Sequence, residues 1–162
     1  MDESEFWQLI EAAKAVSKGD VQAQVAQLHD SLAKLQPAEI ASFDEHFRSF
    51  LARAYTWELW AAAYIINGGC SDDCFEYFRG WLIAQGKDPF ENALRDPQTL
   101  TPIANPDADG EPMLYVAQTV YESKTGKDLP QPDVVQPSEP RGKQWDEESV
   151  DQLYPVLAAR FS

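Results

Sequence analysis

The amino-acid sequence predicts an all-α protein, a single-domain helical bundle or array of about seven to eight helices with a C-terminal segment packed back on it. Three observations support this fold class. Apolar residues recur every three or four positions over most of the chain. Capping residues precede these periodic stretches, and glycines follow them. No stretch combines strict apolar and polar alternation with the turn residues of a β-hairpin.

The first third of the chain is expected to form three amphipathic helices. Asp2 and Glu5 have the spacing of a capping box, and the helix that they begin ends at Lys18-Gly19. Asp20 can cap the second helix. Pro37 suits the first position of the third helix, where no backbone N–H is needed. Each helix carries an apolar stripe that predicts a buried face.

The middle of the chain predicts a central helix followed by a strongly capped one. Residues 55–66 are apolar on nearly every side, which is typical of a helix in the centre of a domain. Asn67-Gly68-Gly69 ends this helix, because these residues tolerate the left-handed conformation. Ser71 is expected to cap a helix that runs to Gln85, and a short helix follows over residues 88–95.

The last third alternates loops with two helices. Residues 96–110 contain three prolines and predict a surface loop, and residues 112–125 predict a helix. We expect a helical core domain over residues 1–126 and a Pro-rich extended linker over residues 127–144. Residues 145–162 are expected to form an amphipathic helix that docks on the core, kinked or divided at Pro155.

The charge balance limits the classes of partner. The chain has 27 acidic and 13 basic residues and a formal net charge of −14, which repels phosphate backbones and anionic lipids. We therefore expect no direct binding of nucleic acid and no membrane association. The start MDESEFW lacks a secretory pattern, and the apolar stretch over residues 59–66 is too short to span a bilayer. A cytoplasmic protein is predicted.

The two cysteines, Cys70 and Cys74, are expected to be small core thiols. Two cysteines do not make a disulfide framework, and no histidine base is near them in sequence. The carboxylates that follow Ser71 oppose a lowered thiol pKa, which argues against a catalytic cysteine. Free thiols also suit a reducing cytoplasm.

The segment over residues 65–86 concentrates the chemistry of the chain. Asp72, Glu76 and Arg79 fall on one helix face and predict a ladder of charges. One interpretation is structural, with acids favouring the helix N-terminus and Arg79 neutralising Glu76. The other is a site at the start of the helix, in which Asn67, Asp72, Asp73 and Arg79 surround a small cavity.

Two ion-binding interpretations of the loops are weaker. Gly68-Gly69 could present N–H groups to a phosphate, but Asp72 and Asp73 at the same helix end would oppose it unless a divalent cation intervened. The P-loop pattern is also absent. The stretch NPDADGEP has calcium-loop features, yet Val116 stands where the pattern needs a bidentate Glu, so a polar turn is favoured.

An aromatic cluster flanks the same segment. At helical spacing such residues more often form core than a ligand platform, although their polar tips need partners when they are buried. One or two are therefore expected to line a groove. The cluster comprises Tyr55, Trp57, Trp60, Tyr64, Tyr77, Phe78 and Trp81.

Three stretches carry a resemblance to a bacterial family, domain of unknown function 4240. They are FWQLIEAA (6–13), AYTWELWAAAYIINGGCSDDCFEYFRGWLIAQG (54–86) and RGKQWDEESVDQLYPVLAARF (141–161). The resemblance covers roughly residues 1–126, with the last stretch similar to a segment found in some members. It implies a small cytoplasmic bacterial protein without an established activity. The motif residues that it singles out are Asn67, Asp72, Asp73, Arg79 and Trp81.

The leading functional prediction is a non-catalytic binding or interaction module, because the polar cluster lacks a convincing nucleophile or base. The expected partner is a protein segment or a small ligand, with no cofactor. The first alternative is a hydrolase assisted by Mg²⁺ or Mn²⁺, with Asp72 and Asp73 as metal ligands. The second is that the motif only organises the fold and function lies on another surface.

Overall fold

The all-helical prediction is confirmed. A computed structural model describes residues 1–107 and 109–161, and within these it has eight α-helices, three short 3-10 helices and no strand. The α-helices are α1 (Glu3–Ser17), α2 (Val21–Ala33), α3 (Pro37–Arg53), α4 (Trp57–Asn67), α5 (Asp72–Ala84), α6 (Lys87–Arg95), α7 (Val116–Thr125) and α8 (Pro155–Phe161). The 3-10 helices are η1 (Pro97–Leu100), η2 (Glu111–Leu114) and η3 (Val150–Gln152).

The predicted helix ends are largely those of the structure. Asp2 and Glu5 form a reciprocal capping box, with backbone-to-carboxylate distances of 2.8 and 3.0 Å. Asp20 and Ser71 cap α2 and α5, and Pro37 is the first residue of α3. These local side-chain bonds satisfy N–H groups that a helix cannot pair internally, which is why sequence predicts them well.

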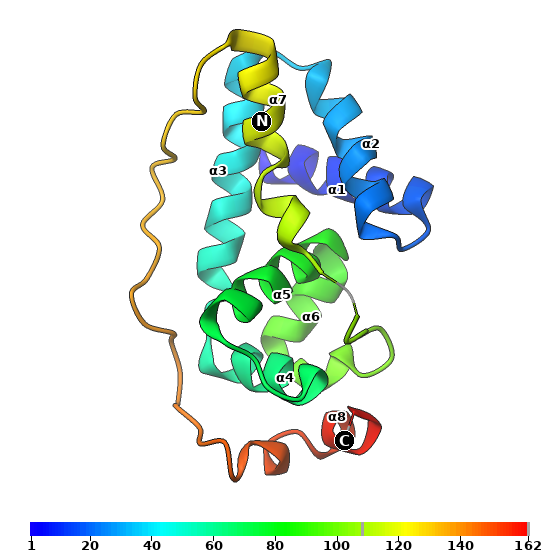
Figure 1. The fold of residues 1–162 in the computed structure, drawn as a ribbon, viewed down its shortest axis with the longest axis vertical. Helices are drawn as coiled ribbons and strands as arrows, with labels where there is room; N and C mark the ends of the chain where they lie inside the picture. Colours follow the sequence, from blue (N-terminus) through cyan, green and yellow to red (C-terminus); the bar gives the residue numbers. More distant parts are fainter. Residues whose placement is uncertain (108, 162) are drawn as a thin grey trace.

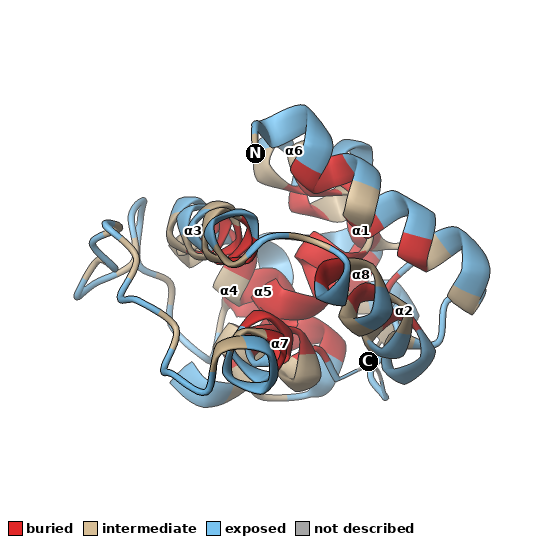
Figure 2. Ribbon diagram, turned by 90° about the horizontal axis from the view of Figure 1, so that it is seen from above, coloured by how far each residue is buried: buried red, intermediate tan, exposed pale blue. Residues whose placement is uncertain are grey.

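The centre of the fold is α5 rather than the helix before it. Other helices surround α5, and its second half is buried without interruption from Phe78 to Ala84 (Figure 2). We expected residues 55–66 to lie at the centre. Instead, α4 buries residues such as Leu59 and Ala62 and leaves half-exposed aromatic residues in contact with Trp145 of the C-terminal segment.

A close backbone contact joins α5 to the loop before η2. A Cβ on Gly80 would lie 2.9 Å from the carbonyl oxygen of Gly110. A Cβ on Gly110 would overlap the backbone nitrogen of Trp81 and the backbone oxygen of Tyr77. Only residues without a side chain allow this approach, so the two glycines set the distance between α5 and η2.

We expect Gly110→Ala to lower the free energy of unfolding by about 3 kcal/mol, because η2 must move off α5. Gly126→Ala is the control, since Gly126 has a positive φ of 71° but open space where a Cβ would stand. It should cost only about 1 kcal/mol through backbone strain. Urea unfolding of both variants measures the difference, and equal losses would contradict the close-contact explanation.

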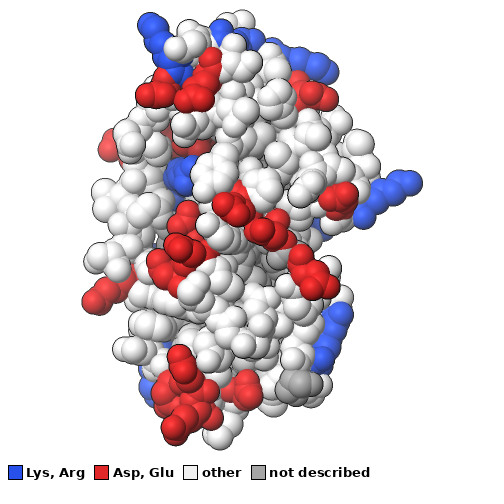
Figure 3. All heavy atoms as spheres, viewed as in Figure 1, with Lys and Arg blue, Asp and Glu red and all other residues white. Residues whose placement is uncertain are grey.

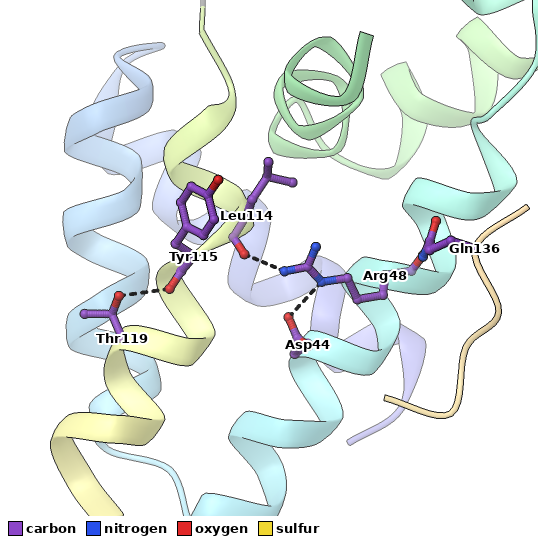
Figure 4. A network of polar contacts seen from close by, with 6 residues as sticks. All are labelled: Asp44, Arg48, Leu114, Tyr115, Thr119 and Gln136. Atoms are coloured by element: carbon purple, nitrogen blue, oxygen red, sulfur yellow. Dashed lines mark hydrogen bonds and ion pairs between the residues drawn. The ribbon is translucent and has the colours of Figure 1, made fainter. Parts of the chain in front are cut away.

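Arg48 connects three parts of the chain near the middle of α3. Its guanidinium donates hydrogen bonds to the Leu114 carbonyl at 2.7 Å and to the Asp44 carboxylate at 3.4 Å (Figure 4). Its own carbonyl accepts a 2.9 Å bond from the Gln136 amide. Burial raises the pKa of Asp44, while the Arg48 charge and hydrogen bond oppose that rise. Arg48 therefore ties α3 to η2 and to the segment that follows α7.

Beyond α7 the chain runs along the side of the bundle before turning under α4 (Figure 1). Residues 127–144 contain no helix. At their end, the Arg141 carbonyl accepts a 2.8 Å bond from the Trp57 N–H, and the Arg141 N–H donates a 3.0 Å bond to the Tyr55 carbonyl. The Arg141 guanidinium also reaches the Arg53 carbonyl at 2.6 Å, close to the end of α3. This backbone pairing fixes the path of the segment.

The predicted C-terminal helix over residues 145–161 is shorter than expected. Asp146 caps only a turn, through Ser149, and the α-helix begins at Pro155. The proline lacks the N–H that a continuing helix needs, so it serves as a start rather than a kink. Val150 and Leu157 are buried, with α8 lying against α4.

Trp145 packs against the aromatic side of α4. Its indole nitrogen donates a 2.7 Å hydrogen bond to the Trp57 carbonyl. Its ring meets Trp57 and Trp60 edge-on, with centroids 6.0 and 6.3 Å apart, and lies 5.2 Å from Tyr64. Part of the predicted aromatic cluster thus receives a side chain of the same protein.

We expect Trp145→Ala to lower the free energy of unfolding by about 2 kcal/mol, through lost aromatic packing and one hydrogen bond. Trp145→Phe keeps a ring on α4 and should cost less than half as much. Trypsin cleavage after Arg141 or Lys143 should be faster in the alanine variant, as followed by mass spectrometry. Unchanged cleavage would mean that Trp145 does not hold the segment.

No helix among residues 1–107 and 109–161 is long and apolar enough to cross a bilayer. Acidic side chains are spread over the whole of the face drawn in Figure 3, from top to bottom, whereas lysine and arginine lie mainly at its edges. This distribution accords with the strongly negative net charge.

Candidate functional site

The candidate residues of the motif separate onto different faces of α5. Asp72, Glu76 and Arg79 line one hollow, with walls from α3 and the linker. Cys74, Phe78 and Trp81 line another, with walls from the end of α4 and the loop before η2. Each set follows the three-to-four-residue spacing of one helix face. We call these the Arg79 hollow and the Trp81 hollow.

Arg79 is buried, with 5% of its surface exposed. Its guanidinium donates hydrogen bonds to the Leu51 carbonyl at 2.7 Å and to the Phe75 carbonyl at 3.4 Å. It also lies over the rings of Tyr55 and Phe75, at 4.5 and 4.8 Å from their centroids. Burial lowers the pKa of Arg79, and the charge of Glu76 partly offsets this. The side chain thus links α5 to the last turns of α3.

The predicted charge ladder does not form as ion pairs. Among the described residues no carboxylate oxygen lies within the 4.0 Å of an ion pair from Arg79. Asp72 instead accepts a 3.0 Å hydrogen bond from the Tyr55 hydroxyl. Burial and the bonded Asp72 carboxylate raise the pKa of Tyr55. Backbone carbonyls and aromatic faces compete successfully for the guanidinium, because they approach it inside the protein where a carboxylate would lose its water.

Arg79→Ala should lower the free energy of unfolding by about 3 kcal/mol, since the Leu51 carbonyl loses its donor and the rings lose a cation. Arg79→Lys should recover only part of this, because an ammonium cannot reproduce the planar contacts. Arg53→Ala is the control and removes a half-exposed ion pair with Glu91. It should cost at most about 1 kcal/mol in the same thermal or urea unfolding series. A loss in Arg79→Ala no larger than in the control would contradict the buried role.

The Trp81 hollow has one apolar side and a polar rim. Ile66, Phe78 and Trp81 form the apolar part of the lining, and Tyr77 stands beside them. Polar groups come from Asn67 at the end of α4 and from the loop before η2. The loop contributes Ala104, Asn105, Pro106 and Asp109, and the cavity volume is about 240 Å³.

The loop that lines this hollow is organised by local turns. The Asn105 side chain accepts a 3.0 Å bond from the Asp107 N–H, and Asp109 accepts a 2.9 Å bond from the Glu111 N–H. These bonds agree with the polar-turn interpretation of the stretch. Part of the calcium pattern, Ala108, falls outside the described residues.

The prediction of free core thiols is wrong. Cys70 and Cys74 form a disulfide across the start of α5, with their Cα atoms 5.3 Å apart. Cys70 packs against the core and its carbonyl accepts a 2.9 Å bond from the Trp60 indole. The Asn67 amide lies 3.6 Å from the Cys74 sulfur. The spacing of four residues places both cysteines at the helix start, which permits this bond when the preceding loop turns back.

The motif residues therefore have three different settings. Asn67 and Trp81 line one hollow, Asp72 and Arg79 line the other, and Asp73 is exposed and lines neither. Within the described residues no three His, Cys, Asp or Glu side chains are grouped as metal ligands would be. The contacts thus give the Asp72 and Asp73 pair no further protein ligand for a metal.

Several lining residues lay outside the sequence prediction. Leu51 and Gln136 contribute to the Arg79 hollow, and Asn105 and Asp109 to the Trp81 hollow. Gln136 is 57 residues beyond Arg79 in the chain, and no local pattern indicates that the linker would pass there. Asp109 belongs to the polar stretch NPDADGEP, but no pattern in that stretch predicts a contact with the hollow that Trp81 lines.

Comparison with protein families decides the relationship of the chain. The model of the family described as Protein of unknown function (DUF4240) matches residues 1–123. The chain belongs to this family. No match was found among curated proteins or among solved structures. All residues that line the Trp81 hollow lie inside the DUF4240 region, whereas Gln136 and Pro137 of the Arg79 hollow lie beyond it.

Proposed function

We propose that this DUF4240 protein is a non-catalytic binding module whose Trp81 hollow receives one side chain of a protein segment. The observation that carries the proposal is the construction of the hollow. Aromatic and aliphatic side chains line it together with the polar Asn67, Asn105 and Asp109, entirely within the part of the chain that matches the family. This arrangement is typical of small-molecule and anchor sites, which are mostly apolar with a few polar groups at the edge.

The size of the hollow favours a side-chain anchor over a complete ligand. Its volume of about 240 Å³ is below the roughly 300–1,000 Å³ of sites for drug-sized molecules. One aromatic or branched aliphatic side chain is a better match. Anchors of this type commonly supply most of the energy of a protein interface.

The charge near the hollow favours a basic segment around the anchor. Asp109 stands at the rim, and Asp73 is exposed just before Cys74. The protein as a whole has a net charge of −14. Lysine or arginine flanking the anchor would thus be attracted, and acidic flanks repelled.

The two alternatives receive different support. For the Mg²⁺- or Mn²⁺-assisted hydrolase, the Asp72 carboxylate is bonded to Tyr55, and no contact favours a metal. For a purely structural motif, the buried contacts of Arg79 give support, and we assign Arg79 and Asp72 to architecture. The binding role is then assigned to Asn67 and Trp81, with Asp73 as an outer charge.

We further propose that residues 1–126 form the binding core, that residues 127–144 act as a linker and that residues 145–162 close the fold under α4. The contacts of Arg141, Trp145 and Leu157 support this division. We also keep the proposal of a bacterial cytoplasmic location, which rests on the family resemblance alone, because the Cys70–Cys74 disulfide removes the support that free thiols would give.

Asn67→Trp should close the Trp81 hollow from its rim, because Asn67 is exposed at the end of α4. The probes are short peptides with a central Trp, Phe or Leu flanked by lysines, and the same peptides flanked by glutamates. Fluorescence anisotropy should detect binding of lysine-flanked peptides to the wild-type protein. We expect affinity to fall at least about tenfold in Asn67→Trp.

Ser123→Trp is the matched control, since it adds the same side chain to an exposed position of α7 away from the hollow. It should leave peptide affinity unchanged. If no peptide binds, or if both variants bind as the wild-type protein does, the proposed function is wrong.

A further inference from the structure

The Cys70–Cys74 disulfide contributes little to the stability of the start of α5, because several hydrogen bonds already fix the position of that segment. The Ser71 hydroxyl accepts a 3.2 Å bond from the Cys74 N–H, and the Tyr55 hydroxyl donates to Asp72. On the other side, the Trp60 indole donates to the Cys70 carbonyl. The disulfide closes a loop of only five residues, and short loops gain the least from a cross-link.

The two sulfur atoms have unlike surroundings. Both cysteines are half-buried, and Cys70 packs against the hydrophobic core. Cys74 lines the Trp81 hollow, which opens to solvent. A thiolate from solution can therefore attack the Cys74 sulfur through the hollow, and Cys70 is then the leaving group.

The position of Cys74 also suits a sulfur that alternates between bonded and charged forms. It occupies the first turn of α5, where the helix dipole favours a thiolate. The Asn67 amide is 3.6 Å from the sulfur and can donate to it. The neighbouring Asp72 and Asp73 carboxylates oppose this stabilisation, so the Asn67 contact is what favours Cys74 as the thiolate that leaves in the second exchange step. The open hollow is what favours the first attack on its sulfur.

We propose that Cys70 and Cys74 form a thiol–disulfide exchange site that reacts with dithiols through the Trp81 hollow. A thiolate of the external dithiol attacks the Cys74 sulfur, and the bond between Cys74 and Cys70 breaks. Cys70 leaves as a thiolate and takes a proton from water. The second thiol of the external molecule, as its thiolate, then attacks the mixed disulfide and releases Cys74, which is also protonated. Two electrons pass from the dithiol to the protein, and the dithiol becomes a disulfide.

This reaction changes the wall of the Trp81 hollow without requiring the peptide anchor proposed above. In the oxidised protein the Cys74 sulfur is tied to Cys70, and in the reduced protein it is free to turn toward the hollow and Asn67. The exchange site thus stands independently of the binding function, and each has its own test.

The first experiment treats the full-length protein with dithiothreitol over a range of concentrations and blocks free thiols with maleimide before mass spectrometry. We expect conversion from no free thiol to two, at a rate proportional to dithiothreitol concentration, with the circular dichroism spectrum unchanged. A rate that stays constant as dithiothreitol increases would mean that the protein must first unfold. Loss of helicity on reduction would mean that the disulfide is needed for the fold. Two free thiols after oxidation with diamide would mean that the disulfide does not form. Each of these outcomes overturns the proposal.

The second experiment separates the two sulfurs. Cys70→Ser leaves Cys74 as the single thiol, and Cys74→Ser leaves Cys70. With oxidised glutathione, Cys74 should form the mixed disulfide at least about tenfold faster, because it opens on the hollow. Equal rates, or a faster Cys70, would overturn the assigned direction of attack. Asn67→Ala in the Cys70→Ser background should slow the reaction of Cys74, and an unchanged rate would remove Asn67 from the site.

Discussion

The contact between Gly80 and Gly110 is the constraint on which the site depends. It brings the backbone of η2 against the middle of α5, closer than any side chain would permit. With that distance set, residues 104–106 and Asp109 lie beside Trp81 and complete the hollow. Arg48 then reaches the Leu114 carbonyl from α3, so a single close approach positions elements from three parts of the chain.

Around this contact, α5 combines two kinds of burial. One face meets apolar and aromatic groups, and the other holds a guanidinium bonded to carbonyls and covered by rings. A buried cation without a carboxylate at contact distance is tolerated because several weaker contacts replace its water. Asp72 likewise accepts a hydrogen bond from the Tyr55 hydroxyl and does not pair with a cation. The motif is therefore rich in charged residues but is held together by hydrogen bonds and aromatic contacts.

Contacts between residues close together in the sequence were predictable, whereas contacts between residues far apart in the sequence were not. Asp2, Asp20 and Ser71 cap the helices expected of them, because a cap acts within three residues. The division of the motif between two hollows follows from helical spacing, yet the partners Gln136 and Asp109 depend on paths that no local pattern encodes. The prediction of free thiols is wrong because the turn that brings Cys70 back to Cys74 leaves no signal in the number or spacing of the cysteines.

One consequence follows from α5 being the common wall of both hollows. Glu76 and Tyr77 are neighbours in sequence, but Glu76 lines the Arg79 hollow and Tyr77 lines the Trp81 hollow. Thermodynamic linkage requires that an occupant which shifts α5 from one side alters affinity on the other, and that the effect is reciprocal. Gln136 and Pro137, which lie outside the region that matches the family, line the far side of the same helix, so an occupant that contacts them is one that this linkage would include.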